Sequence, residues 1–418
     1  MRPALIIGYR AVTLRACRSL GIPTVTVVGA PQRDWGDLDE TLLDEHVVVD
    51  DHHNVESVVS GLLRAGLLDD RYQAVYTADE FSLVEAAALA EVLHARGLGV
   101  PTAVAFRDKY VQKTLVRDAG FPTAEIELIP DLADPPAGLE ERFSFPAVLK
   151  PVAGGGTMST TLVDRREALA DAIAAARETA STWRTFLLES FNRGQEWNID
   201  GFVADGELGL LAVEAYRDNC LRTIKSGALI GSILFDPVRE AWVYEVARPY
   251  VSAVLEALGL RHGIFHMEAF WDGAGLTFGE CAARIAGGFH SEVVAHKYGV
   301  DLPTVAVQLA YGLDPPTERD PVIDDAVGFT FLPTVPGTLE SCPSPEELAQ
   351  LANVVSAVLE VSPGSVMSDM SSTTIARAGL ALVAAEDEPT LERRMDEVAE
   401  WFRERVVVRD APAPQAAA

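Results

Sequence analysis

A lysine followed by three glycines is the first group of residues that could do chemistry. Lys150 ends the apolar run F-P-A-V-L-K, and Gly154 to Gly156 and Thr157 follow it. A lysine in apolar surroundings needs an anionic partner, and consecutive glycines expose backbone N–H groups that suit a phosphate. Because the lysine precedes the glycines, the segment is not a Walker A loop. On its own, the segment is better explained as a flexible hairpin loop.

Two glutamates form a second group. Glu268 lies in the apolar run G-I-F-H-M-E-A-F, and Glu280 lies twelve residues later, with the turn-forming dipeptide Asp272-Gly273 midway. Antiparallel pairing around that turn would bring the two carboxylates together. Close carboxylates in an apolar setting repel unless a cation lies between them. The pattern therefore predicts a Mg²⁺ site, in which Mn²⁺ could substitute; the alternative is one exposed glutamate and no metal.

The residues after Glu280 are candidates for substrate binding. Arg284 could stabilise charge on a transferring phosphoryl group or clamp a substrate carboxylate. Gly287 and Gly288 allow the backbone to pass close to a ligand, and His290 follows them as a candidate substrate contact.

Two further glutamates flank a loop. Glu189 ends the strand-like run F-L-L-E-S, and Glu196 follows seven residues later. The segment leaving that strand, at Ser190 and Phe191, could offer backbone groups to an adenine, and a carboxylate could accept hydrogen bonds from two ribose hydroxyls. Taken alone, both glutamates are better explained as surface residues, and Lys109 in R-D-K-Y as an exposed helix lysine.

The elements that must position these residues begin with a β-α-β pattern. Ala4 to Gly8 and Thr24 to Val28 are strand-like, with a helix-like stretch between them, which predicts a parallel sheet. The first glycine turn is G-Y-R-A rather than G-x-G-x-x-G. The missing fingerprint argues against a Rossmann oxidoreductase.

Later segments indicate an α+β organisation. Asp205-Gly206 and Asp272-Gly273 separate apolar runs and predict two β-hairpins. Ser344 to Glu347 (S-P-E-E) predicts a helix start with a capping box, and we expect that helix to run through Leu348 to Glu360. The tail at 411–418 (A-P-A-P-Q-A-A-A) is low in complexity and is expected to be disordered.

Composition narrows the class of protein. The chain has 418 residues, and a net charge of −28 makes nucleic acid and anionic membrane unlikely partners because both would be repelled. The ordinary explanation of that charge is solubility. No apolar run reaches the ~20 residues that span a bilayer. The four scattered cysteines form no C-x-x-C pair, so neither a disulfide framework nor a zinc site is expected, and a cytoplasmic location fits best.

Taken in order, these features resemble the ATP-grasp superfamily over nearly the whole chain. The segments K-Y-V-Q-K-T-L-V-R-D-A-G-F-P-T and F-P-A-V-L-K-P are the most similar. The resemblance implies an α/β and α+β architecture in four parts. These are an N-terminal parallel-sheet lobe (1–105), a small ATP-binding lobe (106–185), a large lobe with the metal and substrate sites (186–314) and a C-terminal α+β lobe (315–410).

The resemblance also implies roles for residues. The ATP-binding residues would be Lys109, Lys150, Gly154, Gly155, Gly156, Thr157, Glu189, Ser190, Phe191 and Glu196. The metal ligands would be Glu268 and Glu280; catalysis would depend on Lys150, Glu280 and Arg284; and substrates would contact Arg284, Gly287, Gly288 and His290.

One departure points to a branch of the superfamily. Many relatives have asparagine two residues after the second metal glutamate, where this chain has Ala282. The stretch G-E-C-A-A-R-I-A-G-G is more similar to the L-amino-acid ligases, which make dipeptides. This similarity implies a ligase that joins a small-molecule carboxylate to an amine through an acyl phosphate. A carboxylase, a purine-synthesis type ligase and a nucleotide-binding protein without turnover are the alternatives, and the sequence leaves monomer and homodimer open.

Overall fold

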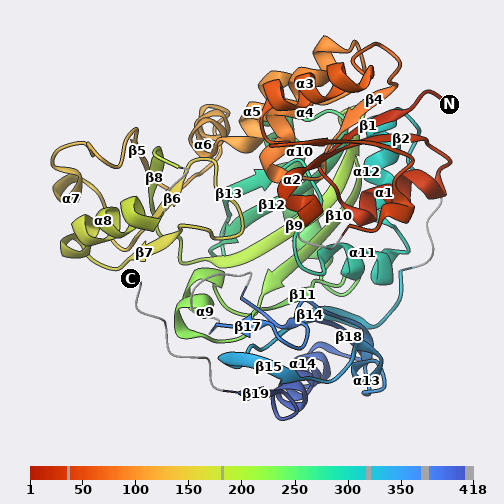
Figure 1. Cartoon of the computed structure of the whole chain (residues 1–418). Coiled ribbons are helices and arrows are strands. Elements are labelled where there is room, and N and C mark those ends of the chain that lie inside the picture. Colours follow the sequence, from red (N-terminus) through yellow and green to blue (C-terminus); the bar gives the residue numbers. More distant parts are fainter. Residues whose placement is uncertain (35–37, 180–182, 317–321, 369–375, 410–418) are drawn as a thin grey trace.

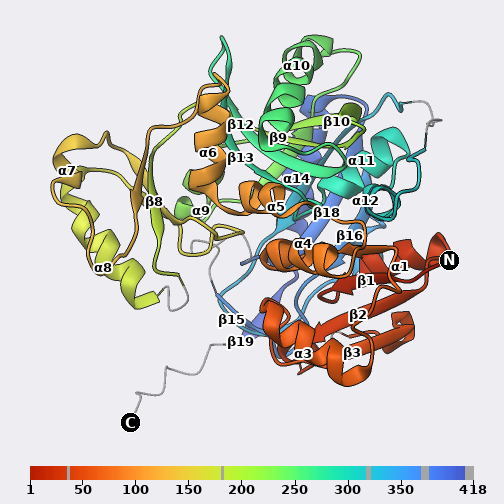
Figure 2. The same cartoon turned by 90° about the horizontal axis from the view of Figure 1, so that it is seen from above.

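The computed structural model describes residues 1–34, 38–179, 183–316, 322–368 and 376–409, so the predicted disordered tail lies outside the described residues. Within these ranges the strands form four sheets. In Figure 1 the N-terminal sheet lies at the top, the small antiparallel sheet at the left, and the large sheet runs through the middle. Seen from above in Figure 2, the small sheet stands to one side of the other elements.

The N-terminal sheet is parallel, as the β-α-β pattern predicted, with strand order β3-β2-β1-β4. Its strands are β1 (Ala4–Ile7), β2 (Thr24–Gly29), β3 (Glu45–Val49) and β4 (Ala74–Tyr76). The helices of this region are α1 (Ala11–Ser19), α2 (Ala30–Asp34), α3 (Val55–Ala65) and α4 (Leu83–Val92), and the short 3-10 helices are η1 (Glu40–Leu42) and η2 (Glu80–Ser82). Alternate residues of β1 point to opposite faces of the sheet. Leu5 and Ile7 belong to one apolar cluster, and Ala4 and Ile6 belong to another, so both faces of this parallel sheet are covered.

Two helices lead into the small sheet, whose strand order is β5-β8-β6-β7. They are α5 (Val100–Arg107) and α6 (Lys109–Asp118). The sheet consists of β5 (Ile126–Ile129), β6 (Ala147–Pro151), β7 (Thr161–Val163) and β8 (Phe186–Ser190), with α7 (Leu139–Arg142), η3 (Arg166–Ala168) and α8 (Leu169–Thr179). The Asp108 carboxylate caps α6 by accepting from the N–H groups of Tyr110 and Val111, which places Lys109 in the first turn.

The large sheet is antiparallel, with strand order β13-β12-β9-β10-β11-β14-β18-β16. Its first five strands are β13 (Leu276–Ala282), β12 (Gly263–Trp271), β9 (Gln195–Ala204), β10 (Glu207–Tyr216) and β11 (Gly231–Leu234). Both predicted hairpins are confirmed, since β9 pairs with β10 and β12 with β13. Asp205 and Gly206 have φ of +53° and +88°, the left-handed conformations that a type I′ turn requires.

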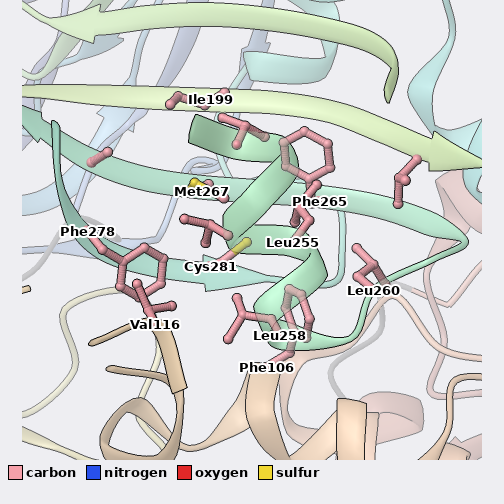
Figure 3. Packing of buried hydrophobic residues seen from close by; sticks show 14 of the residues in the cluster. Phe106, Val116, Ile199, Leu255, Leu258, Leu260, Phe265, Met267, Phe278 and Cys281 are labelled. Atoms are coloured by element: carbon pink, nitrogen blue, oxygen red, sulfur yellow. The ribbon is translucent and has the colours of Figure 1, made fainter. Parts of the chain in front are cut away.

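The two faces of the large sheet differ. Figure 3 shows one face, where side chains such as Ile199, Phe265 and Met267 pack against Leu255 and Leu258 of α10 (Ala241–Leu258). The opposite face is apolar beneath α11 (His290–Tyr298) and α12 (Leu302–Tyr311) and polar toward β13. The short helix α9 (Cys220–Ser226) follows β10.

The C-terminal region extends the large sheet. Its remaining elements are β14 (Ala326–Leu332), β15 (Gly337–Ser341), α13 (Pro345–Leu348), β16 (Val354–Leu359), β17 (Val366–Met367), β18 (Gly379–Ala385), α14 (Glu388–Arg403) and β19 (Val407–Arg409). Strands β17, β15 and β19 form the fourth sheet. Because β11 pairs with β14, the large sheet continues across the predicted boundary at 314/315. The lobe boundaries stay predictions.

The helix expected over 348–360 is wrong. The predicted capping box at Ser344 and Glu347 is present, but α13 ends at Leu348 and β16 follows. Asn353 adopts a φ of +73°, which ends any helical path. The β-branched Val354 and its neighbours then pair with β18 as an edge strand.

Two expectations from composition can be compared with the structure. Within the described ranges, none of the helices combines the length and apolar character that crossing a bilayer requires. All four cysteines are free, as their scattered positions predicted.

Candidate active site

All the predicted site residues line one cavity of about 290 Å³ between the small sheet and the large sheet. They are Lys109, Lys150, Gly154, Gly155, Gly156, Thr157, Glu189, Ser190, Phe191, Glu196, Glu268, Glu280, Arg284, Gly287, Gly288 and His290. Their roles stay predictions. The cavity wall also includes Glu80 from the N-terminal region and Phe329, Phe331 and Arg377 from the C-terminal region, which the sequence patterns missed.

Lysines and glutamates from different elements meet in this cavity. Lys150, at the end of β6, places its Nζ 2.8 Å from Glu189 Oε1 and 3.4 Å from Glu280 Oε2. Lys109 Nζ lies 3.5 Å from the same oxygen of Glu280 and donates to the Gly154 carbonyl at 3.0 Å. Burial opposes the charge on Lys150, but Glu189 and Glu280 outweigh it and raise the pKa of this lysine above its usual value. These glutamates are the anionic partners that its apolar strand required.

A third lysine completes the cluster. Lys113 is 1% exposed, forms an ion pair with Glu189 Oε2 at 3.2 Å and donates to the Gly279 carbonyl. It follows Lys109 by four residues on α6, and this spacing, which puts both lysines on one helix face, could have revealed it. Burial opposes the charge on Glu189, but Lys113 and Lys150 hold its pKa below the usual value. Glu189 therefore binds one lysine through each carboxylate oxygen.

The two predicted metal glutamates lie directly opposite each other in the β12–β13 register. Burial and the nearby charge of Glu280 raise the pKa of Glu268. Burial acts in the same direction on Glu280, but Lys109 and Lys150 lower its pKa. A cation beside Glu268 would relieve the repulsion, so the carboxylate pair fits a divalent ion. Ala282 supplies no side-chain ligand to it.

Glu196, at the start of β9, is 7% exposed, so the alternative of a surface glutamate is wrong for this residue. Its Oε2 accepts from the Cys220 N–H at 3.1 Å and from Asn219 Nδ2 at 3.2 Å. Burial is the main cause that raises its pKa. The start of α9 therefore fixes the orientation of this carboxylate.

Arg284 connects the cavity to the N-terminal region. Its guanidinium pairs with Glu80 of η2, and Arg107 Nη1 lies 3.7 Å from the other Glu80 oxygen. Glu80 follows the carboxyl end of β4, the edge of a parallel sheet where ligand-binding groups gather. Gly288 has a φ of +76°, and an added Cβ there would lie 3.4 Å from the Phe329 ring, so the backbone passes close to the cavity wall.

The middle of the chain is similar to a known family of domains. Residues 143–292 match the family model described as an ATP-grasp domain. The chain therefore carries an ATP-grasp domain, and the fold that its motifs predicted is confirmed.

The particular relatives are amino-acid ligases. The chain is 25% identical over 343 residues to the L-arginine-specific L-amino acid ligase of Bacillus subtilis, covering 80% of this chain and 81% of that protein. The structure of an L-amino acid ligase from Bacillus licheniformis matches with a TM-score of 0.79 and 20% identity, over 98% of this chain and 99% of that one. The predicted resemblance to L-amino-acid ligases is confirmed.

Another enzyme shares the fold. A carboxyaminoimidazole ribonucleotide synthase from Aspergillus clavatus, complexed with ATP, matches with a TM-score of 0.70 and 15% identity, over 96% of this chain and 99% of that one. At this identity the likeness concerns the fold alone.

Proposed function

We propose that the chain is an ATP-dependent ligase that joins the carboxylate of one amino-acid-like substrate to the amine of another through an acyl phosphate. The observation that carries this proposal is the convergence of four residues far apart in the sequence. Lys109 and Lys150 both lie within 3.5 Å of Glu280, which faces Glu268 across the β12–β13 hairpin. Similarity to an L-amino acid ligase over four-fifths of the chain supports an amine as the second substrate.

The nucleotide would occupy the cavity between the two sheets. Lys109, Lys150 and the N–H groups of Gly154 to Gly156 are suited to its phosphates. The segment leaving β8 at Ser190 would face the adenine, and the buried Glu196 carboxylate would accept from the ribose hydroxyls.

A divalent cation fits the carboxylate pair. Glu268 and Glu280 would hold Mg²⁺, or Mn²⁺ in its place, and the ion would neutralise charge on the phosphates. Lys150 would share this task, because its ammonium already lies 3.4 Å from the Glu280 carboxylate.

Arg284, held by Glu80, would orient the substrate carboxylate toward the nucleotide, beside Gly287, Gly288 and His290. A carboxylate oxygen then bonds to the γ-phosphorus while the bond from that phosphorus to the β–γ bridging oxygen breaks, and ADP leaves. The amine nitrogen next bonds to the acyl carbon and loses a proton, and the carbon–oxygen bond to phosphate breaks. Lys150 and Arg284 would stabilise the charge that develops.

A carboxylase is the second candidate. The chain is 29% identical over 198 residues to the methylcrotonoyl-CoA carboxylase subunit alpha, mitochondrial, of Oryza sativa subsp. japonica, covering 43% of this chain and 25% of that protein. In such a reaction bicarbonate would be the carboxylate that ATP activates. Dependence of ADP formation on bicarbonate separates the two candidates.

The test is a matrix of amino-acid pairs scored for phosphate release, with mass spectrometry of the products. We expect ADP and phosphate to form together with an amide of the two amino acids. ADP formation that needs bicarbonate, or that yields no amide with any pair, would reject the ligase.

The metal assignment has its own test. Glu280→Gln removes the carboxylate that faces Glu268 and both lysines, so we expect ligase activity to fall by at least ~100-fold. Glu256→Gln, on the exposed face of α10, is the matched control and should retain activity. Full activity of Glu280→Gln would remove Glu280 from the metal site.

A further inference from the structure

A row of polar side chains crosses the large sheet beyond the proposed magnesium ligands. Strand register places Glu280, Glu268, Asn198 and Glu214 opposite one another on β13, β12, β9 and β10. Opposed residues of neighbouring strands point to the same face of a sheet. Asn198 and Glu214 therefore lie on the face that carries the cavity, yet they have no part in the proposed reaction.

Two more residues meet Glu214 on this face. Asp200 lies two residues after Asn198 on β9, and His290 begins α11. His290 Nδ1 lies 3.0 Å from Glu214 Oε1 and 3.8 Å from Asp200 Oδ2. One donor atom from each of Asp200, Glu214 and His290 lies within 4.8 Å of the others. The three side chains are 2%, 0% and 2% exposed.

Several polar atoms of this cluster make no hydrogen bond to the described residues. Both oxygens of Glu214 and both amide atoms of Asn198 are buried without a hydrogen-bond partner among the described residues. His290 Nδ1 also makes no hydrogen bond there, despite its short distance to Glu214. Among the described residues, His290 is the one ion-pair partner of the Glu214 carboxylate. Burying carboxylates with incomplete compensation is unfavourable, so a cation among these donors would stabilise them.

We propose that Asp200, Glu214 and His290, with the amide oxygen of Asn198, bind a divalent transition-metal cation such as Mn²⁺ or Zn²⁺. Carboxylate oxygens together with an imidazole nitrogen suit these ions. Metal–ligand bonds of about 2.1 Å place donor atoms about 3.0 to 4.2 Å apart. The observed separations of 3.0 and 3.8 Å agree with that range.

A neighbouring histidine supports the arrangement. His266 Nδ1 lies 3.2 Å from both Asp200 oxygens. A hydrogen bond from this ring would fix the orientation of the Asp200 carboxylate, as partners of metal-binding carboxylates commonly do.

The site would be structural. It joins the first residue of α11 to β9 and β10, and α11 follows directly after the Gly287-Gly288 segment of the cavity wall. An ion held only by the folded chain adds its binding free energy to stability. Neither Glu268 nor Glu280 is one of the ligands, so ion binding can be measured apart from the ligase reaction. His290 belongs both to this cluster and to the cavity wall beside the proposed substrate.

Metal content is the test, measured in the Glu280→Gln background so that the magnesium site contributes little. The full-length protein is stripped with EDTA, incubated with Mn²⁺ or Zn²⁺ without nucleotide, dialysed and analysed by inductively coupled plasma mass spectrometry. We expect about one retained ion per chain and a Tm that falls by several degrees on stripping and recovers with the metal.

The ligand assignment is tested with Glu214→Gln and His290→Asn in the same background. Each should lose the retained ion and the metal-dependent part of Tm. Retention of no ion by the parent, or equal retention after both substitutions, would overturn the proposal. If the variants fail to fold, the stoichiometry and the metal-dependent Tm of the parent still decide.

Discussion

The lysines and glutamates of the cavity form a connected network of ion pairs. Each oxygen of Glu189 contacts a different lysine, Lys150 and Lys113, and one oxygen of Glu280 contacts both Lys150 and Lys109. Removing one lysine leaves a glutamate in the cavity with one cation fewer, which is strongly destabilising for a buried carboxylate.

Lys113→Met keeps the length of the side chain and removes its charge. Glu189 would lose one of its two cations while remaining buried, so we expect a loss of about 3–5 kcal/mol in the free energy of unfolding. Urea denaturation measures it. Lys225→Met is the matched control, because Lys225 is 55% exposed and forms an ion pair with the exposed Asp164, a type of pair that contributes about 0–1 kcal/mol. Equal losses of stability in the two variants would show that the ion pair between Lys113 and Glu189 contributes no more than a surface pair.

A histidine beside η2 predicts a pH dependence of stability. The hydrogen bond from His53 Nε2 to Asp79, 3.2 Å long, raises the pKa of His53 above 6.5. Its contribution to stability is therefore complete below pH 6.5 and is lost as the pH rises through the folded-state pKa.

We expect the Tm difference between wild type and His53→Gln to be largest near pH 6 and to shrink toward pH 9, as measured by thermal scans. His46→Gln, at an exposed position on β3, should show no such trend. A Tm difference for His53→Gln that stays constant with pH would exclude the linkage.

The sequence predicted the residues that have a distinctive local setting. Lys150 at the end of an apolar run and Glu268 opposite Glu280 could be found because neighbours in the chain reveal burial and pairing. Glu80 and Arg377 reach the cavity from distant parts of the chain. Their positions depend on how the lobes pack, which no local pattern encodes.

At the scale of elements, the glycine-rich loop after β6 lies against η2. A Cβ added to Gly155 would lie 3.6 Å from the Phe81 ring and 3.7 Å from Glu80. Arg107 donates to the Gly154 carbonyl at 3.2 Å and lies 4.7 Å from the centre of the Phe81 ring. The loop is therefore held from two sides, which favours one conformation of its N–H groups.

Gly156→Val tests the loop. Gly156 has a φ of +59°, where a β-branched residue is strained by about 1–2 kcal/mol, so the loop should adopt another path and KM for ATP should rise by about tenfold. Gly66→Val is the matched control, since its φ is +71° at the open C-terminal end of α3 and Gly66 does not line the cavity. Both variants should lose similar stability. Equal KM values would show that the loop does not contact the nucleotide.

Turn signals predicted elements better than capping signals did. Asp205-Gly206 and Asp272-Gly273 specify both the turn and the pairing of the flanking strands, and both hairpins are present. Ser344 and Glu347 specify where a helix begins but not its length, so α13 ends after one turn. The edge strand β16 forms because it pairs with β18, whose residues lie 20 to 29 positions later in the chain.

At the scale of the whole molecule, the C-terminal strands β14, β18 and β16 share one sheet with β9 to β13. Strand β14 pairs with β11 on one side and β18 on the other. Arg217, just after β10, binds Asp396 of α14 through two hydrogen bonds of 2.6 and 3.1 Å. Phe329 and Arg377 bring this region to the cavity wall. The parts should therefore unfold together.

A chain of residues 1–314 tests this continuity. It lacks β14, β18 and β16, so β11 becomes an exposed edge and the apolar cluster beneath α11 loses Val327, Phe329 and Phe331. We expect this fragment to be insoluble or to show no cooperative thermal transition by circular dichroism. A chain of residues 1–409 is the control and should melt as the full-length protein does. A soluble 1–314 fragment with a sharp transition would show that the lobes fold separately.

The row from Glu280 to Glu214 has a consequence for folding. Side chains alternate between the two faces of a strand. On β9 the residues flanking Asn198 are Trp197 and Ile199, and both belong to the apolar cluster on the other face. Mispairing β9 by a single residue would place Asn198 and Asp200 in the apolar cluster and Trp197 among the buried polar side chains of the other face. The polar residues proposed to bind metal and nucleotide therefore also favour a single register of the central strands. A chain whose strands paired in another register would be less stable than the native fold.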